Sequence, residues 1–139
     1  MKIVIDTNVL IAAFISRGAC ADVFEHCVRR HVLISSDHIL REFREALALK
    51  FHFTRSEISE AEELLKRRIH MVKPAVLPGD TCRDPSDIPV LGTAVSGECK
   101  CIISGEKDLL DLRRFRNISI ISPFDFWRFE ADVEKNSKR

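Results

Sequence analysis

Short runs of branched apolar residues, separated by longer segments with helical spacing, are the feature that most restricts the fold of this chain. Five such runs are rich in Val and Ile and nearly continuous, which predicts strands that are covered on both faces. Strands that alternate with helices favour an α/β fold with a mainly parallel sheet. The strands are expected at residues 2–6, 32–35, 71–76, 101–104 and 118–121.

The segments between these runs have the 3.6-residue periodicity of helices. Ser36, Ser56 and Asp87 are expected to be the N-caps of the second, third and fourth helices. Pro89 then falls in the first turn of the fourth helix, where its missing N–H costs little. Helical segments are expected at residues 11–14 with 21–30, 36–47, 56–69, 87–96, 109–115 and 123–133.

The length of 139 residues suits a single domain that spans residues 1–139, with a charged and frayed tail at 134–139. Apolar residues make up 45% of the chain and charged residues 31%, as in ordinary globular proteins. No apolar run approaches the ~20 residues that span a bilayer, and the N-terminal stretch is too short for a signal peptide. We therefore expect a cytoplasmic protein with no membrane association.

Charge and cysteine content exclude two further classes. With 22 basic and 21 acidic residues, the chain is not one that coats nucleic acid by net charge. Five cysteines with no regular spacing do not form a disulfide framework. A zinc site that included Cys99 and Cys101 would need two more ligands, and the five histidines supply no obvious pair. Buried small side chains are the favoured interpretation of these cysteines.

Acidic side chains gather at the predicted ends of strands and starts of helices. The carboxyl ends of parallel strands meet at one edge of a sheet, where ligands bind. Carboxylates that meet there repel one another unless cations neutralise them, and oxygen ligands favour Mg²⁺ or Mn²⁺. Such a site suits phosphoryl chemistry. The residues concerned are Asp6, Thr7, Asn8, Glu42, Asp84, Asp87, Ser104, Glu106 and Asp108.

Each acid taken alone also has a purely structural interpretation. Asp6 and Asp87 can serve only as helix N-caps. Glu42 can pair with a neighbouring arginine on a solvated helix face. Glu106 and Asp108 can be turn residues, with Asp108 capping a short helix. The metal-site interpretation depends on these acids being brought together by the fold.

Five ordered segments resemble the sequence motifs of PIN-domain ribonucleases. A lone Asp-Thr-Asn after a strand is weak evidence, whereas five segments in the right order along nearly the whole chain are specific. The resemblance implies a PIN-like three-layer α/β/α fold with a mainly parallel sheet of about five strands. The segments are residues 3–10, 36–42, 82–87 followed by Leu91 and Ala94, 102–110, and 121–126.

The residues of these motifs are similar to those of small prokaryotic PIN proteins of the VapC-like type, which are described as toxins of toxin–antitoxin pairs. This resemblance implies a Mg²⁺- or Mn²⁺-dependent endoribonuclease that cleaves single-stranded or structured RNA and leaves 5′-phosphates. It also implies a homodimer and a small antitoxin protein as partner. The implied metal ligands and catalytic residues are Asp6, Glu42, Asp87 and Glu106, and the implied supporting residues are Thr7, Asn8, Asp84, Ser104 and Asp108.

Two departures from the family pattern keep other functions open. Glu106 stands where the family more often has Asp, and Ile88-Pro89 replaces residues that are commonly polar. They motivate a second hypothesis, a catalytically weak PIN-fold module that binds RNA or protein. A third hypothesis is a phosphatase with Asp6 as nucleophile. That chemistry typically needs a second Asp two residues later, where this chain has Asn8.

Overall fold

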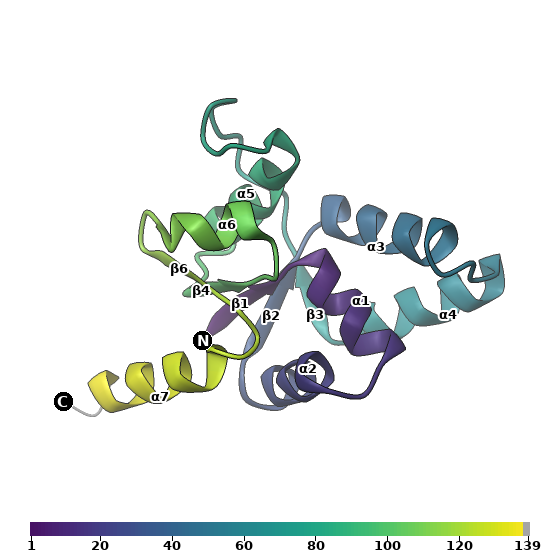
Figure 1. Cartoon of the computed structure of the whole chain (residues 1–139), viewed down its shortest axis with the longest axis horizontal. Helices are drawn as coiled ribbons and strands as arrows, with labels where there is room; N and C mark the ends of the chain where they lie inside the picture. Colours follow the sequence, from purple (N-terminus) through teal and green to yellow (C-terminus); the bar gives the residue numbers. More distant parts are fainter. Residues whose placement is uncertain (138–139) are drawn as a thin grey trace.

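A computed structural model describes residues 1–137 as a mainly parallel sheet with helices on both faces (Figure 1). Its six strands lie in the order β3-β2-β1-β4-β6-β5, and every described pairing is parallel except that of β5 with β6. The predicted three-layer α/β/α class is confirmed, with one short strand more than expected. The strands are β1 Lys2–Ile5, β2 Val32–Ser35, β3 Ile69–Met71, β4 Cys101–Ile103, β5 Arg114–Phe115 and β6 Ile118–Ile121.

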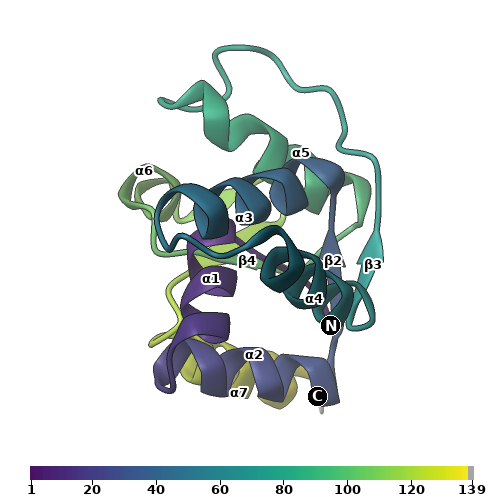
Figure 2. The ribbon, with the colours of Figure 1, turned by 90° about the vertical axis from the view of Figure 1, so that its right-hand side faces the viewer.

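Connections between parallel strands are right-handed as a rule, and the strand order reverses its direction after β3, so helices before and after β3 are expected on opposite faces of the sheet. Helices α1 to α4 lie on one face and α5 with α6 on the other, while α7 ends the described chain beside α2 (Figures 1 and 2). Their bounds are α1 Thr7–Ile15, α2 Ala19–Arg30, α3 Asp37–Leu49, α4 Arg55–Lys66, the 3₁₀ helix η1 Pro85–Asp87, α5 Ile88–Ser96, α6 Lys107–Leu112 and α7 Phe126–Ser137.

Within residues 1–137, no single helix has the length and apolar character of a membrane span. The pair formed by α1 and α2 meets the length and composition criteria only when both helices are counted together, and they are bent by 103° relative to each other. Both helices contribute instead to the buried core: Val9 and Leu10 of α1 and Val23 and Phe24 of α2 are buried.

The core forms where the sheet meets the apolar faces of its helices. Ile3 and Ile102 on the central strands are fully buried. The face of α3 is the one that its spacing predicts, because every apolar residue expected on it is fully buried. Each such side chain contributes roughly 1.5–3 kcal/mol through burial. The buried residues of α3 are Ile39, Leu40, Phe43 and Leu47.

The third helix, α4, is capped by Thr54 and not by Ser56 as predicted. Thr54 Oγ1 accepts a hydrogen bond from Glu57 N at 3.1 Å, and the Glu57 carboxylate accepts one from Thr54 N at 2.8 Å. This capping box satisfies two backbone donors at once. Ser56 could not form such a box, because the residue three positions later is Ser59 and not an acid. The helix ends at Lys66, so Ile69 belongs to β3 and not to the helix.

The C-terminal helices also differ from the predicted ones. The expected helix at 109–115 divides into α6 and β5, because Arg113 adopts a left-handed φ of 61° and ends the helix. Helix α7 begins at Phe126, after a turn in which Asp125 N donates to Ser122 O. It continues to Ser137, so residues 134–137 of the expected tail belong to the helix. Residues 138–139 lie outside the described part of the chain.

The third strand, β3, is shorter than predicted and begins two residues earlier. Pro74 has no N–H for a strand ladder, and the chain leaves the sheet after Met71 and arches over to α5 (Figure 2). Ala75 N donates to Gly92 O at 3.0 Å where the segment crosses α5. A Cβ at Gly92 would lie 2.4 Å from Ala75 O, so this crossing requires glycine.

All five cysteines are free thiols. Cys27, Cys99 and Cys101 are buried, which confirms their interpretation as small core side chains, whereas Cys20 and Cys82 are only partly buried. No pair of these thiols is joined, in agreement with the irregular spacing of the cysteines in the sequence.

Gly92→Ala is expected to lower the free energy of unfolding by about 1–3 kcal/mol, because the added methyl displaces the backbone at Ala75 from α5. Chemical denaturation followed by circular dichroism measures the change. Gly79→Ala is the control, since a Cβ there meets nothing within 4 Å, and its effect should stay within about 0.5 kcal/mol. Equal stability of the two variants would contradict the close crossing.

Candidate functional site

The predicted acids line one cleft at the carboxyl edge of the sheet, with a volume of about 320 Å³. The fold thus brings together side chains that lie far apart in the sequence. Two predicted residues, Ser104 and Asp108, do not line the cleft. Ser104 donates a hydrogen bond to Asp6, and a carboxylate oxygen of Asp108 lies within 4.8 Å of oxygens of Asp84 and Asp87. The lining includes the four predicted ligands Asp6, Glu42, Asp87 and Glu106 and the predicted supporting residues Thr7, Asn8 and Asp84.

Asp6 is held firmly at the end of β1. Its N–H donates to Ile103 O at 2.9 Å, and only 4% of the residue is exposed. Its Oδ1 accepts from Thr7 N and its Oδ2 from Ser104 Oγ, both at 2.8 Å. Asp6 is therefore both the cap of α1, which starts at Thr7 and not at residue 11, and a carboxylate of the cleft. Burial raises its pKa, against the lowering effect of the two hydrogen bonds.

Glu42 reaches the cleft from α3. Its Oε1 accepts from Thr7 Oγ1 at 3.2 Å, and His38 Nε2 lies 3.2 Å away without the alignment of a hydrogen bond. The alternative pairing with an arginine finds no support at Arg44, which binds Glu62 at 2.9 Å instead. Thr7 thereby connects the first acid of the cleft with the second.

The loop before α5 carries the third acid. Asp84 caps the 3₁₀ helix, because its Oδ1 accepts from Ser86 N at 3.0 Å and from Ser86 Oγ at 2.9 Å. Asp87 stands at the N-cap position of α5 but makes no capping hydrogen bond, so capping alone does not account for it. Carboxylate oxygens of Asp84, Asp87 and Asp108 lie within 4.8 Å of one another. Arg83 Nη1 approaches Asp108 at 3.7 Å from the exposed side.

Electrostatic repulsion is concentrated on Asp87. Partial burial and then the charges of Asp6, Asp84, Glu106 and Asp108 raise the pKa of Asp87 from 3.8 to about 7. The metal-free cleft therefore holds more negative charge than its surroundings compensate near neutral pH.

Glu106 occupies the N-cap position of α6 and faces Asn8 across the cleft. Its backbone N–H donates to Ser104 Oγ at 3.0 Å, and the Asn8 side-chain amide donates to its carboxylate. Because Ser104 Oγ also donates to Asp6, this hydroxyl joins the first and fourth acids. Asp108 lies inside the first turn of α6, which begins at Lys107, so the predicted capping of that helix by Asp108 is wrong.

The cleft lining also includes five residues that were not among the predicted site residues: Glu45, Ala46, Leu49, Lys50 and Ser86. Glu45 lies three residues after Glu42 on α3, a spacing that places both on one helix face and that signals the position in retrospect. Lys50 follows the last residue of α3 and adds a positive charge to the rim. Ser86 is held by Asp84.

The profile of the PIN domain family matches residues 2–108, which contain all four predicted acids. This chain therefore belongs to the PIN domain family. Six chains of solved structures also match. One belongs to the crystal structure of VapBC2 from Rickettsia felis bound to a DNA fragment from their promoter, with a TM-score of 0.61 and 10% identity over 86% of this chain and 97% of that one. At that identity the similarity shows the fold. Comparison with curated proteins gives no match.

Asp87→Asn is expected to stabilise the metal-free protein at neutral and alkaline pH. The pKa of Asp87 is about 7 in the folded protein and 3.8 ordinarily. The free energy of unfolding of the native sequence therefore falls as the pH rises from about 4 to 7, because the folded state resists ionisation of this carboxyl group. The variant should gain about 1 kcal/mol of unfolding free energy at pH 8, after allowance for solvent exposure, and little at pH 4.

Urea denaturation of the chelator-treated protein at both pH values measures this gain. Asp132→Asn, at an exposed position of α7, is the matched control and should show no pH-dependent difference. A gain at pH 4 that equals the gain at pH 8 would contradict the electrostatic origin.

Proposed function

We propose that this protein is a metal-dependent endoribonuclease that hydrolyses phosphodiester bonds in single-stranded or structured RNA. The observation that carries the proposal is the convergence of Asp6, Glu42, Asp87 and Glu106 on one cleft. Membership of the PIN domain family and the fold shared with a chain of the VapBC2 structure support a nuclease of a toxin–antitoxin pair.

The donor set of the cleft fits Mg²⁺ or Mn²⁺. The four acids that would hold it offer only carboxylate oxygens, the ligands that these hard cations prefer. Partial burial and then the charges of neighbouring acids raise the pKa of Asp87, and a bound cation would compensate this negative charge. When bound, such an ion lowers the pKa of a water and stabilises the leaving oxygen of a phosphodiester.

The protein's own residues would organise this reaction in three ways. Ser104 and Thr7 fix both oxygens of Asp6, which keeps its carboxylate in one orientation before any ligand arrives. Asn8 holds the longer side chain of Glu106 at the opposite wall. Lys50 at the rim supplies a positive charge for an RNA phosphate, because the remaining lining is strongly acidic.

We further propose that the chain acts as a single domain, residues 1–139, in the cytoplasm as the toxin of a toxin–antitoxin pair. The likeness of fold to a chain of VapBC2, a structure that contains promoter DNA, supports this role. The proposal includes a homodimer and a small antitoxin whose segment covers the acidic cleft. Phe51 and Trp127, which are both more than one-third exposed, are apolar side chains available for such contacts.

The alternative is a catalytically weak PIN-fold module that binds RNA or protein. The observation in its favour is that the carboxylate of Glu106 is engaged by Asn8. A phosphatase with Asp6 as nucleophile is disfavoured, because both oxygens of Asp6 accept hydrogen bonds and the residue is almost fully buried.

Asp6→Asn is expected to reduce RNA cleavage by on the order of 100-fold or more, since a bound metal ion contributes several kcal/mol to the transition state. The amide keeps the shape of the side chain but removes its charge. Cleavage of a labelled RNA in millimolar Mn²⁺ measures the loss, with Asp132→Asn as the control of equal charge change. Cleavage retained in Asp6→Asn would refute the nuclease assignment of this cleft.

Ser104→Ala is expected to weaken Mn²⁺ binding by about 10- to 100-fold, because Asp6 loses the hydroxyl that orients it. Isothermal titration calorimetry with Mn²⁺ alone measures the affinity. It also distinguishes the metal-dependent nuclease from the catalytically weak binding module. Absence of Mn²⁺ binding at millimolar concentration in the native sequence would favour the non-catalytic module.

The toxin role is tested by expression in cells: growth should be arrested, and co-expression of a small protein encoded beside this one should relieve the arrest.

A further inference from the structure

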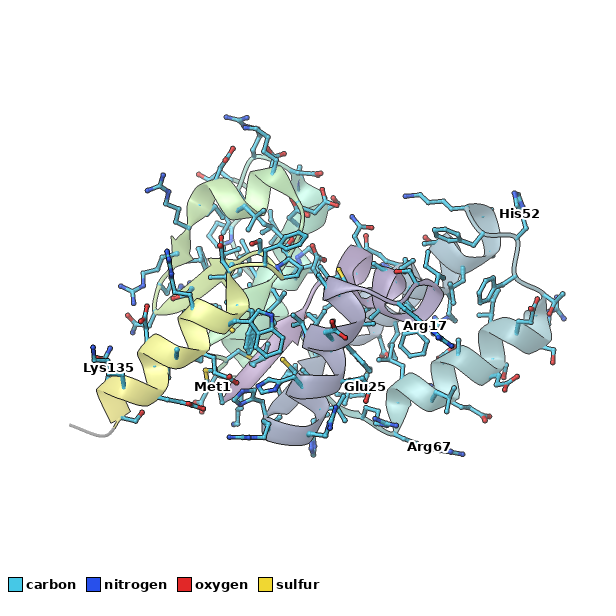
Figure 3. The ribbon with its side chains drawn as sticks, turned by 60° about the horizontal axis from the view of Figure 1, so that its bottom comes forward. Met1, Arg17, Glu25, His52, Arg67 and Lys135 are labelled. Carbon is cyan, nitrogen blue, oxygen red and sulfur yellow. The ribbon has the colours of Figure 1, made fainter. Side chains whose placement is uncertain are left out.

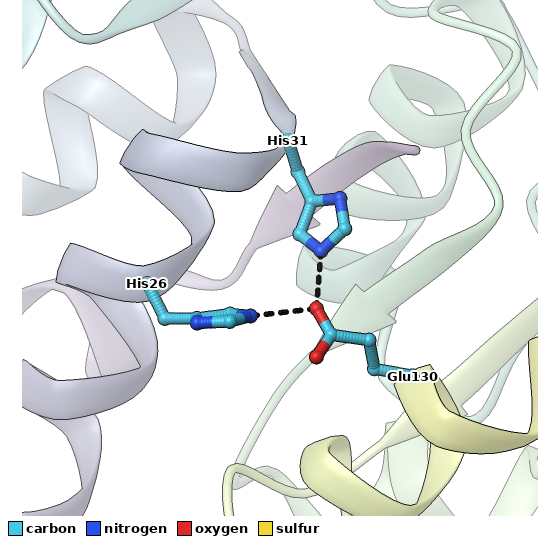
Figure 4. A group of neighbouring side chains, drawn as sticks. All are labelled: His26, His31 and Glu130. Carbon is cyan, nitrogen blue, oxygen red and sulfur yellow. Dashed lines mark hydrogen bonds and ion pairs between the residues drawn. The ribbon is translucent and has the colours of Figure 1, made fainter. Parts of the chain in front are cut away.

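A second group of metal-binding side chains lies outside the acidic cleft, between α2 and α7 (Figure 4). His26 belongs to α2, His31 follows its last residue, and Glu130 belongs to α7. Glu130 Oε2 lies 2.6 Å from His26 Nε2 and 2.5 Å from His31 Nε2. One ligand atom from each residue lies within 4.8 Å of the other two.

The surroundings of this group are largely apolar. The side chains of His31, Glu130 and His26 are only 8%, 12% and 24% exposed. Phe126 is fully buried beside both imidazoles, and the Trp127 ring lies 4.7 Å from the His26 ring. Charged and polar ligands in such a setting interact strongly with a cation, because little water competes with it.

The N-terminal amine of Met1 contacts the ring nitrogen of His31 that faces away from Glu130. The His31 Nδ1 lies 3.1 Å from the Met1 amine nitrogen, and this contact turns Nε2 toward Glu130. A protonated amine can only donate, so Nδ1 accepts this hydrogen bond and the ring proton lies on Nε2, which it must leave when a metal ion binds there. The same strand, β1, that leads to Asp6 starts immediately after this contact.

We propose that His26, His31 and Glu130 form a binding site for a transition-metal ion of borderline softness, Zn²⁺ in the first place. Two imidazoles with one carboxylate are a donor set that zinc accepts, whereas Mg²⁺ prefers oxygen alone. Zinc bonds of about 2.0–2.2 Å require each histidine–glutamate pair to separate by about 0.8 Å from its present hydrogen-bond distance. Side-chain rotation of Glu130, which bears both contacts, is the movement that allows this.

Cys27 is adjacent to His26 but is not part of the donor set. Burial first and the Glu130 charge second raise the pKa of its thiol to about 12. Its Sγ is not one of the ligand atoms that lie within 4.8 Å of one another, so Cys27 is not part of the site. The spacing of His26 and His31, four residues between them, lies within the range of zinc-binding histidine pairs, whereas Glu130 is 99 positions further along.

An ion at this site would tie α7 to α2. Helix α7 lies outside the segment that matches the PIN domain family, residues 2–108, and its contacts with α2 include both histidine–glutamate pairs. The zinc site therefore requires a ligand from α7 in addition to the two histidines, and it does not depend on the nuclease proposal. Its expected effect is a metal-dependent gain in stability.

Trp127 provides a direct test, because it is the one Trp in a chain without Tyr. Its ring packs on His26, so its fluorescence reports on this site. ZnCl₂ is titrated into the full chain with millimolar Mg²⁺ present to occupy the acidic cleft. We expect a saturable change at one Zn²⁺ per chain, checked by equilibrium dialysis, and a rise in the melting temperature.

Glu130→Gln distinguishes a metal site from a metal-free clamp, in which the same three residues join α2 and α7 only by hydrogen bonds. Its amide oxygen still accepts from both imidazoles, but the neutral group is a poor zinc ligand, so Zn²⁺ affinity should fall at least 100-fold while the fold is kept. His26→Ala should have the same effect in dialysis. Two controls should bind as the native sequence does: Glu134→Gln, exposed one turn later on α7, and His52→Gln, at the far end of the molecule from α7 (Figure 3).

Two results would overturn the proposal. One is the absence of Zn²⁺ binding at 100 µM. This concentration is about ten times the dissociation constant of a weak site, about 10 µM, so such a site would be nearly filled. The other is binding that persists unchanged in both Glu130→Gln and His26→Ala. In either case the three residues would form a metal-free clamp between α2 and α7. Circular dichroism of each variant confirms that the comparison is made between folded proteins.

Discussion

Repulsion between carboxylates at the carboxyl edge of the sheet is the constraint around which this structure is organised. The parallel pairing of β1 with β4 brings Asp6 and the residues after Ile103 to the same edge. A fold that gathers acids in this way loses stability unless it supplies compensation. The hydroxyls of Ser104 and Thr7 supply part of it by donating to the acids. The remainder is left uncompensated, as the raised pKa of Asp87 indicates.

The features that the sequence predicted well depend on local periodicity and on topology. Branched apolar runs located four of the five expected strands to within a residue at each end, and the spacing on α3 identified its buried face. The gathering of the acids followed from one general property of parallel sheets, namely that strand ends meet at one edge. Glu42 joined them although it lies within a helix, and that placement came from the family resemblance rather than from its spacing.

One missed feature was local, whereas the others depend on backbone geometry or on particular tertiary contacts. The choice of Thr54 over Ser56 as a cap was readable in the sequence, since Glu57 completes a capping box. The left-handed turn at Arg113 and the crossing at Gly92 were not, because each is set by a neighbour distant in the sequence or by backbone geometry. The pairing of Glu130 with two histidines about 100 positions earlier is of the same kind.

The two edges of the sheet carry a consequence for how this protein can associate with others. The outermost strands, β3 and β5, have three and two residues. Edge strands of this length present few unpaired backbone groups, which disfavours extension of the sheet by a strand from another chain. Side-chain surfaces on the helices are then the expected sites of association with a copy of itself or with a different protein. Specificity for a partner would accordingly reside in helix faces, which change by substitution without any change in the sheet.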